Sequence, residues 1–276
     1  MKIIDGKSYA AELRAQLKTK IEKADRVPGL AVVIVGSDPA SQIYVRNKIR
    51  ACGEVGIKSY SYELPENATQ EQVEALLDEL AGDARINGIL LQLPLPKHLN
   101  AESAMSHIPF EKDVDGFSPQ NLGLLMLHKE RVVACTPLGI MKLLEHEQVN
   151  LTGKHAVVLG RSDTVGKPMA TLLLNANATV TVCHSKTTNL KEICKTADLI
   201  VSAVGKANFV TEDMVKDGAI VIDVGMNRDE NGKLCGDVDF EKVKEKASLI
   251  TPVPGGVGPM TITMLMYNTC LATFKE

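Results

Sequence analysis

The sequence lacks tryptophan and contains few aromatic residues, which make up 4% of the chain. Its six cysteines are scattered without a CxxC pair, so we expect reduced thiols packed in a core and neither a disulfide framework nor a metal site. No hydrophobic run reaches the length of a membrane span, and the first residues lack the charged head and apolar core of a signal peptide. These absences lead us to expect a cytoplasmic protein with no membrane partner.

A strong excess of one charge is also missing. The net charge is −3, with no basic block and no interleaving of arginine with aromatic residues. We therefore expect no nucleic-acid partner and favour a small molecule. What the sequence does contain is a hydrophobic content of 45% in 276 residues, which is enough for a buried core and two domains.

Short β-branched runs alternate with helical patterns in two blocks, which predicts mostly parallel sheets covered by helices. The first block opens with a helix, and we expect strands at 30–35, 57–63 and 88–91 with helices at 39–54 and 69–82. In the second block we expect strands at 155–159, 179–183, 199–203, 219–224 and 249–250. The fold class is therefore α/β with two domains and a cleft between them, joined in the turn-rich segment 109–139.

One uncharged segment, residues 251–261, has six prolines and glycines among its eleven residues. Proline fixes φ, whereas glycine permits positive φ and lets a ligand approach the main chain closely. The segment lies between a strand-like run at 248–250 and a helix-like run at 260–274, so we expect a loop that leaves a strand end, where α/β proteins bind ligands. The alternative is a rigid crossover between domains that binds nothing.

A second glycine-containing loop, residues 160–166, follows the first strand of the second block and precedes a helical run at 169–175. In dinucleotide-binding folds such a loop brings backbone N–H groups and a helix N-terminus to the pyrophosphate. The middle glycine of the usual GxGxxG pattern is missing, so an ordinary strand-to-helix turn is the alternative.

The end of the next strand, residues 183–187, distinguishes between two cofactors. An NAD site usually has an acidic residue there, but this segment has His184 and Lys186 and no carboxylate. With Arg161 in the facing loop, these groups suit a 2′-phosphate and favour NADP over NAD. The alternative is that His184 and Lys186 are solvated loop residues.

The first block contains further candidates for chemistry. Tyr44 and Lys48 are four residues apart in a predicted helix and therefore share one face, where a tyrosine can stack on a ligand and a lysine can transfer protons. The alternative is an ordinary amphipathic surface. Gln92 ends an apolar strand and precedes two prolines, so its amide either holds a lysine or substrate or caps the strand.

Residues 111–117 contain spaced carboxylates before a glycine. The ligand spacing and terminal glutamate of an EF-hand are absent, so we expect no metal here. A carboxylate that accepts two hydrogen bonds from an amino-heterocycle is the better interpretation of this segment.

Taken in order, these segments resemble the bifunctional methylenetetrahydrofolate dehydrogenase/cyclohydrolase family over essentially the whole chain; they are residues 44–48, 92–96, 113–116, 160–166 and 251–261. The resemblance implies oxidation of 5,10-methylenetetrahydrofolate to the 5,10-methenyl form with NADP+, followed by hydrolysis to 10-formyltetrahydrofolate. It also implies a homodimer. Hydride transfer then depends mainly on positioning, whereas ring opening needs proton transfers that a lysine can assist.

The same resemblance implies roles for single residues. Tyr44 matches the residue that stacks on the aminobenzoate ring, Lys48 the catalytic lysine of the cyclohydrolase step, and Gln92 a residue that tunes Lys48. Asp115 matches the position that binds the pterin amino edge, and we count these four residues as catalytic candidates. Folate-lining positions are matched by Pro254 and Gly255, and cofactor-contacting positions by Gly160, Arg161, Ser162, Ser185 and Met226.

We thus expect a folate-binding catalytic domain at residues 1–138, completed by a C-terminal helix at 259–276, and a Rossmann-like NADP-binding domain at 139–258. Three alternatives stay open at this point. They are another two-domain NADP-dependent dehydrogenase of the shikimate-dehydrogenase type, a non-catalytic folate- or nucleotide-binding module, and a monofunctional dehydrogenase. The last would most simply show a substitution at Lys48, and none is present.

Overall fold

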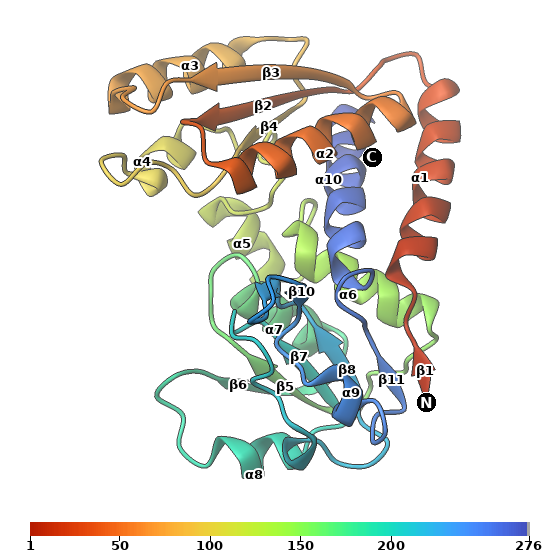
Figure 1. Ribbon diagram of the computed structural model, residues 1–276. Helices are drawn as coiled ribbons and strands as arrows, with labels where there is room; N and C mark the ends of the chain where they lie inside the picture. Colours follow the sequence, from red (N-terminus) through yellow and green to blue (C-terminus); the bar gives the residue numbers. More distant parts are fainter. Residues whose placement is uncertain (275–276) are drawn as a thin grey trace. The chain divides into compact units, whose positions relative to one another are not determined.

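The computed structural model describes residues 1–274 and divides into two compact units, each built on its own parallel sheet (Figure 1). The three-stranded unit consists of Glu12–Cys135 together with residues from Ile262 onward. The six-stranded unit consists of Met1–Ala11 and Thr136–Thr261. Helices α1 (Gly6–Glu22) and α10 (Val257–Phe274) each contribute residues to both units.

The three-stranded unit has the strand order β3-β2-β4, with both pairs parallel. Its elements are β2 (Gly29–Val35), α2 (Pro39–Val55), β3 (Lys58–Leu64), α3 (Gln70–Gly82), β4 (Gly88–Leu91), α4 (Ala101–Ser106) and α5 (Pro119–Met126). Every residue of the central strand β2 is buried. Because side chains alternate along a strand, Ala31, Val33 and Val35 share one face, where they pack into a core with α3 and α4. Helix α2 packs against β2 and β3 on the opposite face.

The six-stranded unit has the order β1-β11-β8-β7-β5-β6, with all neighbouring strands parallel. Its strands are β1 (Lys2–Ile3), β5 (His155–Leu159), β6 (Thr179–Cys183), β7 (Leu199–Ser202), β8 (Ile220–Asp223) and β11 (Leu249–Ile250). Its helices are α6 (Cys135–His146), α7 (Gly166–Asn175), α8 (Leu190–Lys195), α9 (Phe240–Val243) and a 3-10 turn at Glu212–Met214. A short antiparallel pair, β9 (Asn227–Arg228) and β10 (Leu234–Cys235), completes it.

The strand order of the larger sheet confirms the expected Rossmann-like arrangement. From β5 the chain goes to β6 on one side and then to β7 on the other, so the order reverses between β5 and β7. In open parallel sheets, ligands bind outside the carboxyl ends of the strands at such a switch point. This places the loop after β5 at the position where a nucleotide site is expected.

Three expectations need correction. Residues 1–11 belong to the six-stranded unit and not to the first domain, because β1 pairs with β11. The loop expected at 251–261 is shorter, since α10 begins at Val257 and accommodates Pro259 in its first turn, where a proline costs no helical hydrogen bond. The helix after the glycine loop begins at Gly166, three residues earlier than expected.

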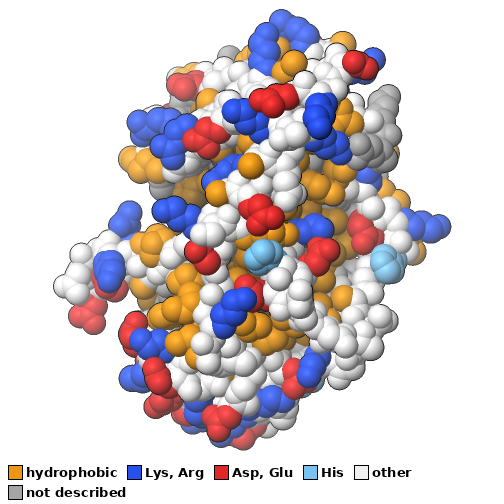
Figure 2. Space-filling model, turned by 90° about the vertical axis from the view of Figure 1, so that its right-hand side faces the viewer, with side chains coloured by type: hydrophobic (Ala, Val, Ile, Leu, Met, Phe, Trp, Pro, Cys, Tyr) orange, Lys and Arg blue, Asp and Glu red, His pale blue; other side chains and the backbone are white. Residues whose placement is uncertain are grey.

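Charged side chains of both signs are mixed over the face drawn in Figure 2. No helix within residues 1–274 combines the length and the apolar character needed to cross a membrane.

Leu77 offers a test of how the three-stranded unit is stabilised, because its side chain is fully buried between α3 and the sheet. We expect Leu77→Ala to lower the free energy of unfolding by about 2–5 kcal/mol through lost transfer energy and an unfilled cavity. Urea unfolding followed by circular dichroism measures this. Leu174→Ala, at a leucine that is 57% exposed, is the matched control and should cost less than about 0.5 kcal/mol. Equal losses in the two variants would contradict the description of this core.

Candidate active site

Helix α2 presents the first two candidate residues, and its ends are well defined. The Asp38 carboxylate accepts a hydrogen bond from the backbone N–H of Ser41 at 2.8 Å, and Pro39 occupies the first helical position. At the other end Gly56, with φ of +92°, supplies the left-handed residue that stops the helix. These ends set the register that places Tyr44 and Lys48 one turn apart on the same face.

The structure brings Lys48 and Gln92 into direct contact. Lys48 Nζ donates a hydrogen bond to Gln92 Oε1 at 3.1 Å, and Gln92 Nε2 donates to the Leu93 carbonyl at 2.6 Å. Gln92 follows β4 directly, and its backbone N–H donates to Val33 on the neighbouring strand at 2.8 Å. Because the Nε2 group is bound to a carbonyl, the amide oxygen has to face the ammonium group. The Lys48 and Gln92 side chains are half-buried.

Asp115 lies close enough to Lys48 for the two charges to interact. Burial raises the pKa of its half-buried carboxyl group to about 6; the charge of Lys48 opposes this shift, and the charge of Asp113 adds to it. Among the described residues, none donates a hydrogen bond to the Asp115 carboxylate. Both of its oxygens therefore keep their capacity to accept hydrogen bonds from a ligand.

Asp113 differs from its neighbour, because its carboxylate is engaged within the loop. It accepts hydrogen bonds from the backbone N–H groups of Gly116 at 2.9 Å and Ser118 at 2.7 Å, and from Asn121 Nδ2 at 2.9 Å. Gly116 has φ of +73°, and a Cβ there would lie 2.6 Å from the backbone nitrogen of Ala134. Asp113 therefore shapes the loop that carries Asp115. Within residues 1–274, no group of three or more His, Cys, Asp or Glu side chains could hold a metal ion.

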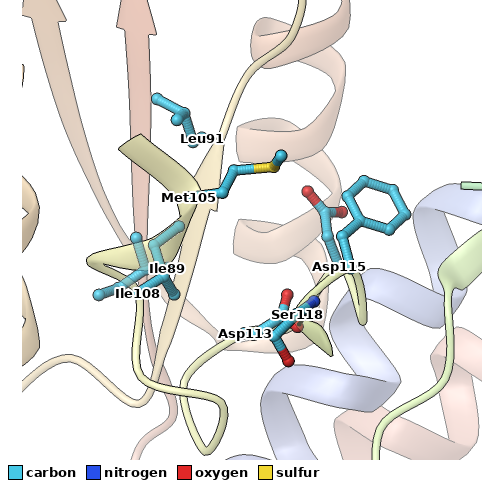
Figure 3. A pocket seen from close by; sticks show the side chains of 8 residues that line it. Ile89, Leu91, Met105, Ile108, Asp113, Asp115 and Ser118 are labelled. Atoms are coloured by element: carbon cyan, nitrogen blue, oxygen red, sulfur yellow. Dashed lines mark hydrogen bonds between the residues drawn. The ribbon is translucent and has the colours of Figure 1, made fainter. Parts of the chain in front are cut away.

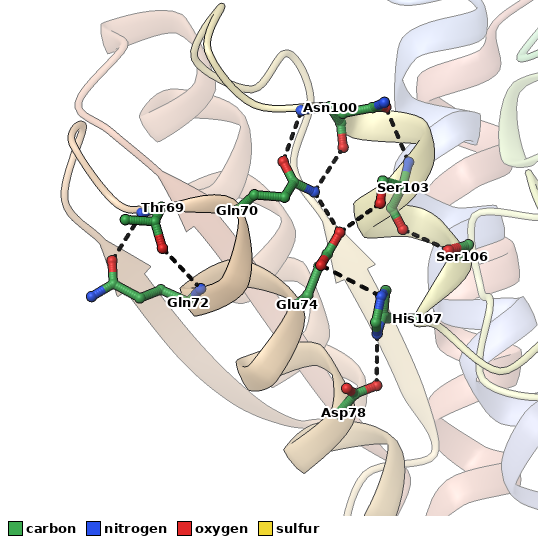
Figure 4. A network of polar contacts seen from close by, with 9 residues as sticks. All are labelled: Thr69, Gln70, Gln72, Glu74, Asp78, Asn100, Ser103, Ser106 and His107. Atoms are coloured by element: carbon green, nitrogen blue, oxygen red, sulfur yellow. Dashed lines mark hydrogen bonds and ion pairs between the residues drawn. The ribbon is translucent and has the colours of Figure 1, made fainter.

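A small pocket of about 20 Å³ lies beside Asp115 (Figure 3), lined by Ile89, Leu91, Met105, Ile108, Asp113, Asp115, Phe117 and Ser118. Its wall at Met105 and Ile108 comes from α4 and the turn that follows it. A polar network anchors α4 to α3 (Figure 4): Ser103 Oγ donates to Glu74 Oε1 at 2.6 Å, and His107 Nδ1 lies 2.8 Å from Asp78 Oδ1. The hydrogen bond with Asp78 raises the pKa of His107. The network thus holds one wall of the pocket in place.

The glycine loop after β5 requires both of its glycines. Gly160 has φ of +114°, and a Cβ there would lie 2.4 Å from the Ala203 carbonyl oxygen at the end of β7. A Cβ at Gly166 would lie 2.3 Å from the carbonyl oxygen of Gly160. Ser162 Oγ accepts hydrogen bonds from the N–H groups of Val165 and Gly166 at 3.2 and 3.3 Å. The loop is therefore a close-packed turn that opens α7 while the Arg161 side chain stays exposed.

The other expected cofactor contacts follow neighbouring strands. Ser185 comes after β6 and Met226 after β8, and both side chains are exposed. Since β6, β5, β7 and β8 are parallel neighbours, the segments carrying Gly160, Ser185 and Met226 all leave the same edge of the sheet. After β6 the chain turns tightly, because the N–H of His184 donates to Thr187 Oγ1 at 2.9 Å and the N–H of Thr187 donates to the His184 carbonyl at 2.8 Å.

Two buried aspartates behind this edge were not predicted from the sequence. Asp237 accepts hydrogen bonds from the backbone N–H groups of Val204 at 2.7 Å and Lys206 at 3.0 Å and from Asn227 Nδ2 at 3.0 Å. It thereby ties the loop after β7 to the segment after β8. The available signal was the run Gly236-Asp237, in which a glycine stands beside an acidic residue.

Asp223, at the end of β8, is the second of these residues. Its carboxylate accepts hydrogen bonds from the N–H groups of Gly225, Asp237 and Val238, each at 2.9 Å. Burial raises its pKa to about 6, although these hydrogen bonds oppose the shift. A Cβ at Gly236 would lie 1.8 Å from Asp223 Oδ2, so only glycine fits beside this carboxylate.

Pro254 and Gly255 lie in the six-stranded unit, in the loop between β11 and α10. Gly255 has φ of +108°, and its carbonyl accepts a hydrogen bond from the N–H of Lys7 at 2.9 Å. A Cβ at Gly6 would lie 1.9 Å from the carbonyl oxygen of Gly256. The start of α1 therefore braces this loop through direct backbone contact.

Comparison with known proteins identifies the family. A family model described as the catalytic domain of tetrahydrofolate dehydrogenase/cyclohydrolase matches residues 4–115, and one described as the NAD(P)-binding domain of the same enzymes matches residues 134–276. The chain belongs to the tetrahydrofolate dehydrogenase/cyclohydrolase family. The bifunctional protein FolD of Lactococcus lactis subsp. cremoris (strain MG1363) is 54% identical over 279 residues, covering 100% of this chain and 98% of that protein.

Solved structures of the tetrahydrofolate dehydrogenase/cyclohydrolase family have the same fold. The bifunctional enzyme FolD from Campylobacter jejuni matches with a TM-score of 0.98 at 51% identity and covers 100% of both chains. The Trypanosoma brucei enzyme, complexed with NADP cofactor and inhibitor, matches with a TM-score of 0.95 at 40% identity and covers 99% of this chain and 97% of that one.

The two neighbouring aspartates should respond in opposite ways to the same substitution. The pKa of Asp115 in the folded protein lies above its ordinary value of 3.8, so ionisation opposes folding as the pH rises from about 4 through about 6. We expect Asp115→Asn to raise the melting temperature at pH 8 and to leave it nearly unchanged at pH 4. Asp113→Asn, the matched control, should lower it at pH 8, because an amide nitrogen would then face an N–H donor. Calorimetry at the two pH values measures this; a lower melting temperature for Asp115→Asn at pH 8 would contradict the account.

Proposed function

We propose that the protein oxidises 5,10-methylenetetrahydrofolate to 5,10-methenyltetrahydrofolate with NADP+ and then hydrolyses that product to 10-formyltetrahydrofolate. The observation that carries this proposal is the contact of Lys48 with Gln92 beside Asp115, in a chain that belongs to the tetrahydrofolate dehydrogenase/cyclohydrolase family over its length.

The residues of the six-stranded unit fit NADP. Gly160 and Gly166 let the loop after β5 turn closely into the N-terminus of α7, where dinucleotide-binding folds hold a pyrophosphate. No carboxylate follows β6 in residues 183–187, and Arg161 is exposed to meet a 2′-phosphate. When bound, NADP+ accepts the hydride from the folate methylene group. We propose that Ser162, Ser185 and Met226 also contact it.

For the hydrolase step we propose Lys48 as the group that moves protons. Addition of water to the methenyl carbon releases one proton and leaves a hydroxyl group on that carbon. As the ring opens, the bond from this carbon to N5 breaks, the hydroxyl group loses its proton to become the formyl carbonyl, and N5 takes up a proton. Gln92 holds Lys48 Nζ through a neutral oxygen at 3.1 Å. The neutral amide of Gln92 thus orients the amine by a hydrogen bond without placing a further charge against it.

For folate binding we propose that Asp115 accepts hydrogen bonds from the pterin amino edge and that Tyr44 stacks on the aminobenzoate ring. The unengaged oxygens of Asp115 and the position of Tyr44 one turn from Lys48 support these roles. We propose folate contacts for Pro254 and Gly255 as well.

The alternatives are less well supported. Family membership disfavours a dehydrogenase of the shikimate type, and a non-catalytic module would have no need for the Lys48–Gln92 contact. A homodimer stays a prediction that follows from the family resemblance. A cytoplasmic location stays a prediction that follows from the sequence features given above.

Replacing the lysine should separate the two activities. We expect Lys48→Met to reduce cyclohydrolase activity by about 100-fold or more, because general acid–base catalysis typically contributes that much. Dehydrogenase activity should survive, so that the methenyl compound accumulates and its absorbance reports the effect. Arg46→Met, at an exposed residue of the same helix, is the control. If Lys48→Met hydrolysed the methenyl compound at the wild-type rate, the proposed role of Lys48 would be ruled out.

The glycine loop can be tested by adding a single methyl group. We expect Gly160→Ala to raise the KM for NADP+ about 10-fold or more while changing the KM for the folate little, because the added Cβ would collide with the Ala203 carbonyl and shift the loop. Gly153→Ala strains a residue with φ of +73° in the same unit, where no neighbouring atom lies within 4 Å, and serves as the control. If both variants behaved alike, backbone strain and not loop position would explain the effect.

A further inference from the structure

A fully buried asparagine on the last helix reaches the loop that carries Asp115. Asn268, in α10, has 0% exposure, and its Nδ2 group donates hydrogen bonds to the carbonyls of Val114 and Val133, both at 2.9 Å. All of these residues belong to the three-stranded unit. One amide group therefore joins two chain segments that are far apart in sequence from α10.

The amide makes these two bonds at a cost. Asn268 Oδ1 is buried and finds no hydrogen-bond partner among the described residues, which is unfavourable for a polar atom removed from water. An apolar side chain at this position would avoid that loss. The advantage of asparagine over an apolar residue therefore lies in the two hydrogen bonds that its Nδ2 group donates to the Val114 and Val133 carbonyls.

One of these hydrogen bonds fixes the peptide unit next to Asp115. The Val114 carbonyl belongs to the planar peptide unit that joins Val114 to Asp115. A hydrogen bond that fixes this oxygen therefore fixes the orientation of the peptide plane to which the Asp115 Cα is attached. Cys135 Sγ donates to the same oxygen at 3.4 Å. The second carbonyl, that of Val133, lies in the segment against which Gly116 packs without room for a Cβ. Asn268 thus ties together the two segments on either side of the Asp115–Gly116 turn.

We propose that Asn268 is a positioning residue for folate binding, which acts by fixing the direction in which Asp115 presents its carboxylate. This inference rests on the proposed function, in which Asp115 binds the pterin.

Asn268→Leu removes both donors with little change in size. We expect the KM for methylenetetrahydrofolate to rise about 10-fold while the KM for NADP+ stays within about 2-fold. Thr269→Val is the matched control, since Thr269 is equally buried and its hydroxyl bonds only to Leu265 of its own helix. Asn268→Ser keeps one donor and should fall between wild type and Asn268→Leu; it carries the test if Asn268→Leu does not fold. A rise in both KM values, or in neither, would overturn the inference.

A double-mutant cycle separates this inference from the function on which it rests. If Asn268 acts through Asp115, Asn268→Leu adds no further increase in the folate KM when Asp115→Asn is already present. If Asp115→Asn raises the KM but the two effects multiply, the positioning role fails and the role of Asp115 stands. If Asp115→Asn leaves the folate KM unchanged, the proposed pterin contact is wrong and the inference fails with it.

Discussion

Close contact between backbone and carboxylate is the constraint on which both candidate sites depend. Loops at the carboxyl ends of parallel strands expose N–H groups that no strand partner can satisfy. In the three-stranded unit Asp113 accepts two backbone N–H groups, and in the six-stranded unit Asp237 and Asp223 each accept three. The carboxylates of Asp223 and Asp237 can approach only where a glycine leaves room, at Gly236 and Gly225 respectively. The neighbouring polar residues are then left to meet a ligand.

Carboxylates that shape a loop differ from the carboxylate of Asp115 in their hydrogen bonds. Asp113 and Asp115 are two residues apart, yet the first is engaged by three donors and the second by none among the described residues. Burial raises the pKa of Asp115, and the charge of Lys48 limits that rise. An ammonium group, a neutral amide and a carboxylate thus share one end of the smaller sheet. The roles proposed for Lys48, Gln92 and Asp115 rest on this grouping.

Much of the fold followed from local patterns in the sequence. Strands β4, β5 and β6 have the bounds expected for them. β4 and β5 are short apolar runs that are largely buried, and the edge strand β6 is a short run rich in β-branched residues. The two-residue strands β1, β9 and β10 are too short to show a period, and they were missed. The loop predicted at 251–261 is too long, because proline and glycine occur in the first turn of a helix as well as in loops.

Some features of the candidate site could likewise be predicted from the sequence, and others could not. The pairing of Lys48 with Gln92 was one of two open interpretations, and the structure supports it with a hydrogen bond. Asp223 and Asn268 could not have been found, because most of their partners lie far away in the sequence and no local pattern marks them. For Asp237 the available signal was the adjacent Gly236, but its hydrogen-bond partners are distant in the sequence.

The most direct test of the central claim is to mix the purified protein with methylenetetrahydrofolate and NADP+ and to follow the absorbance of the reduced cofactor and of the methenyl compound together. We predict cofactor reduction with little accumulation of the methenyl compound, because a second step consumes it. Reduction with lasting methenyl absorbance would contradict the bifunctional assignment, and no reduction with either NADP+ or NAD+ would contradict the enzyme itself.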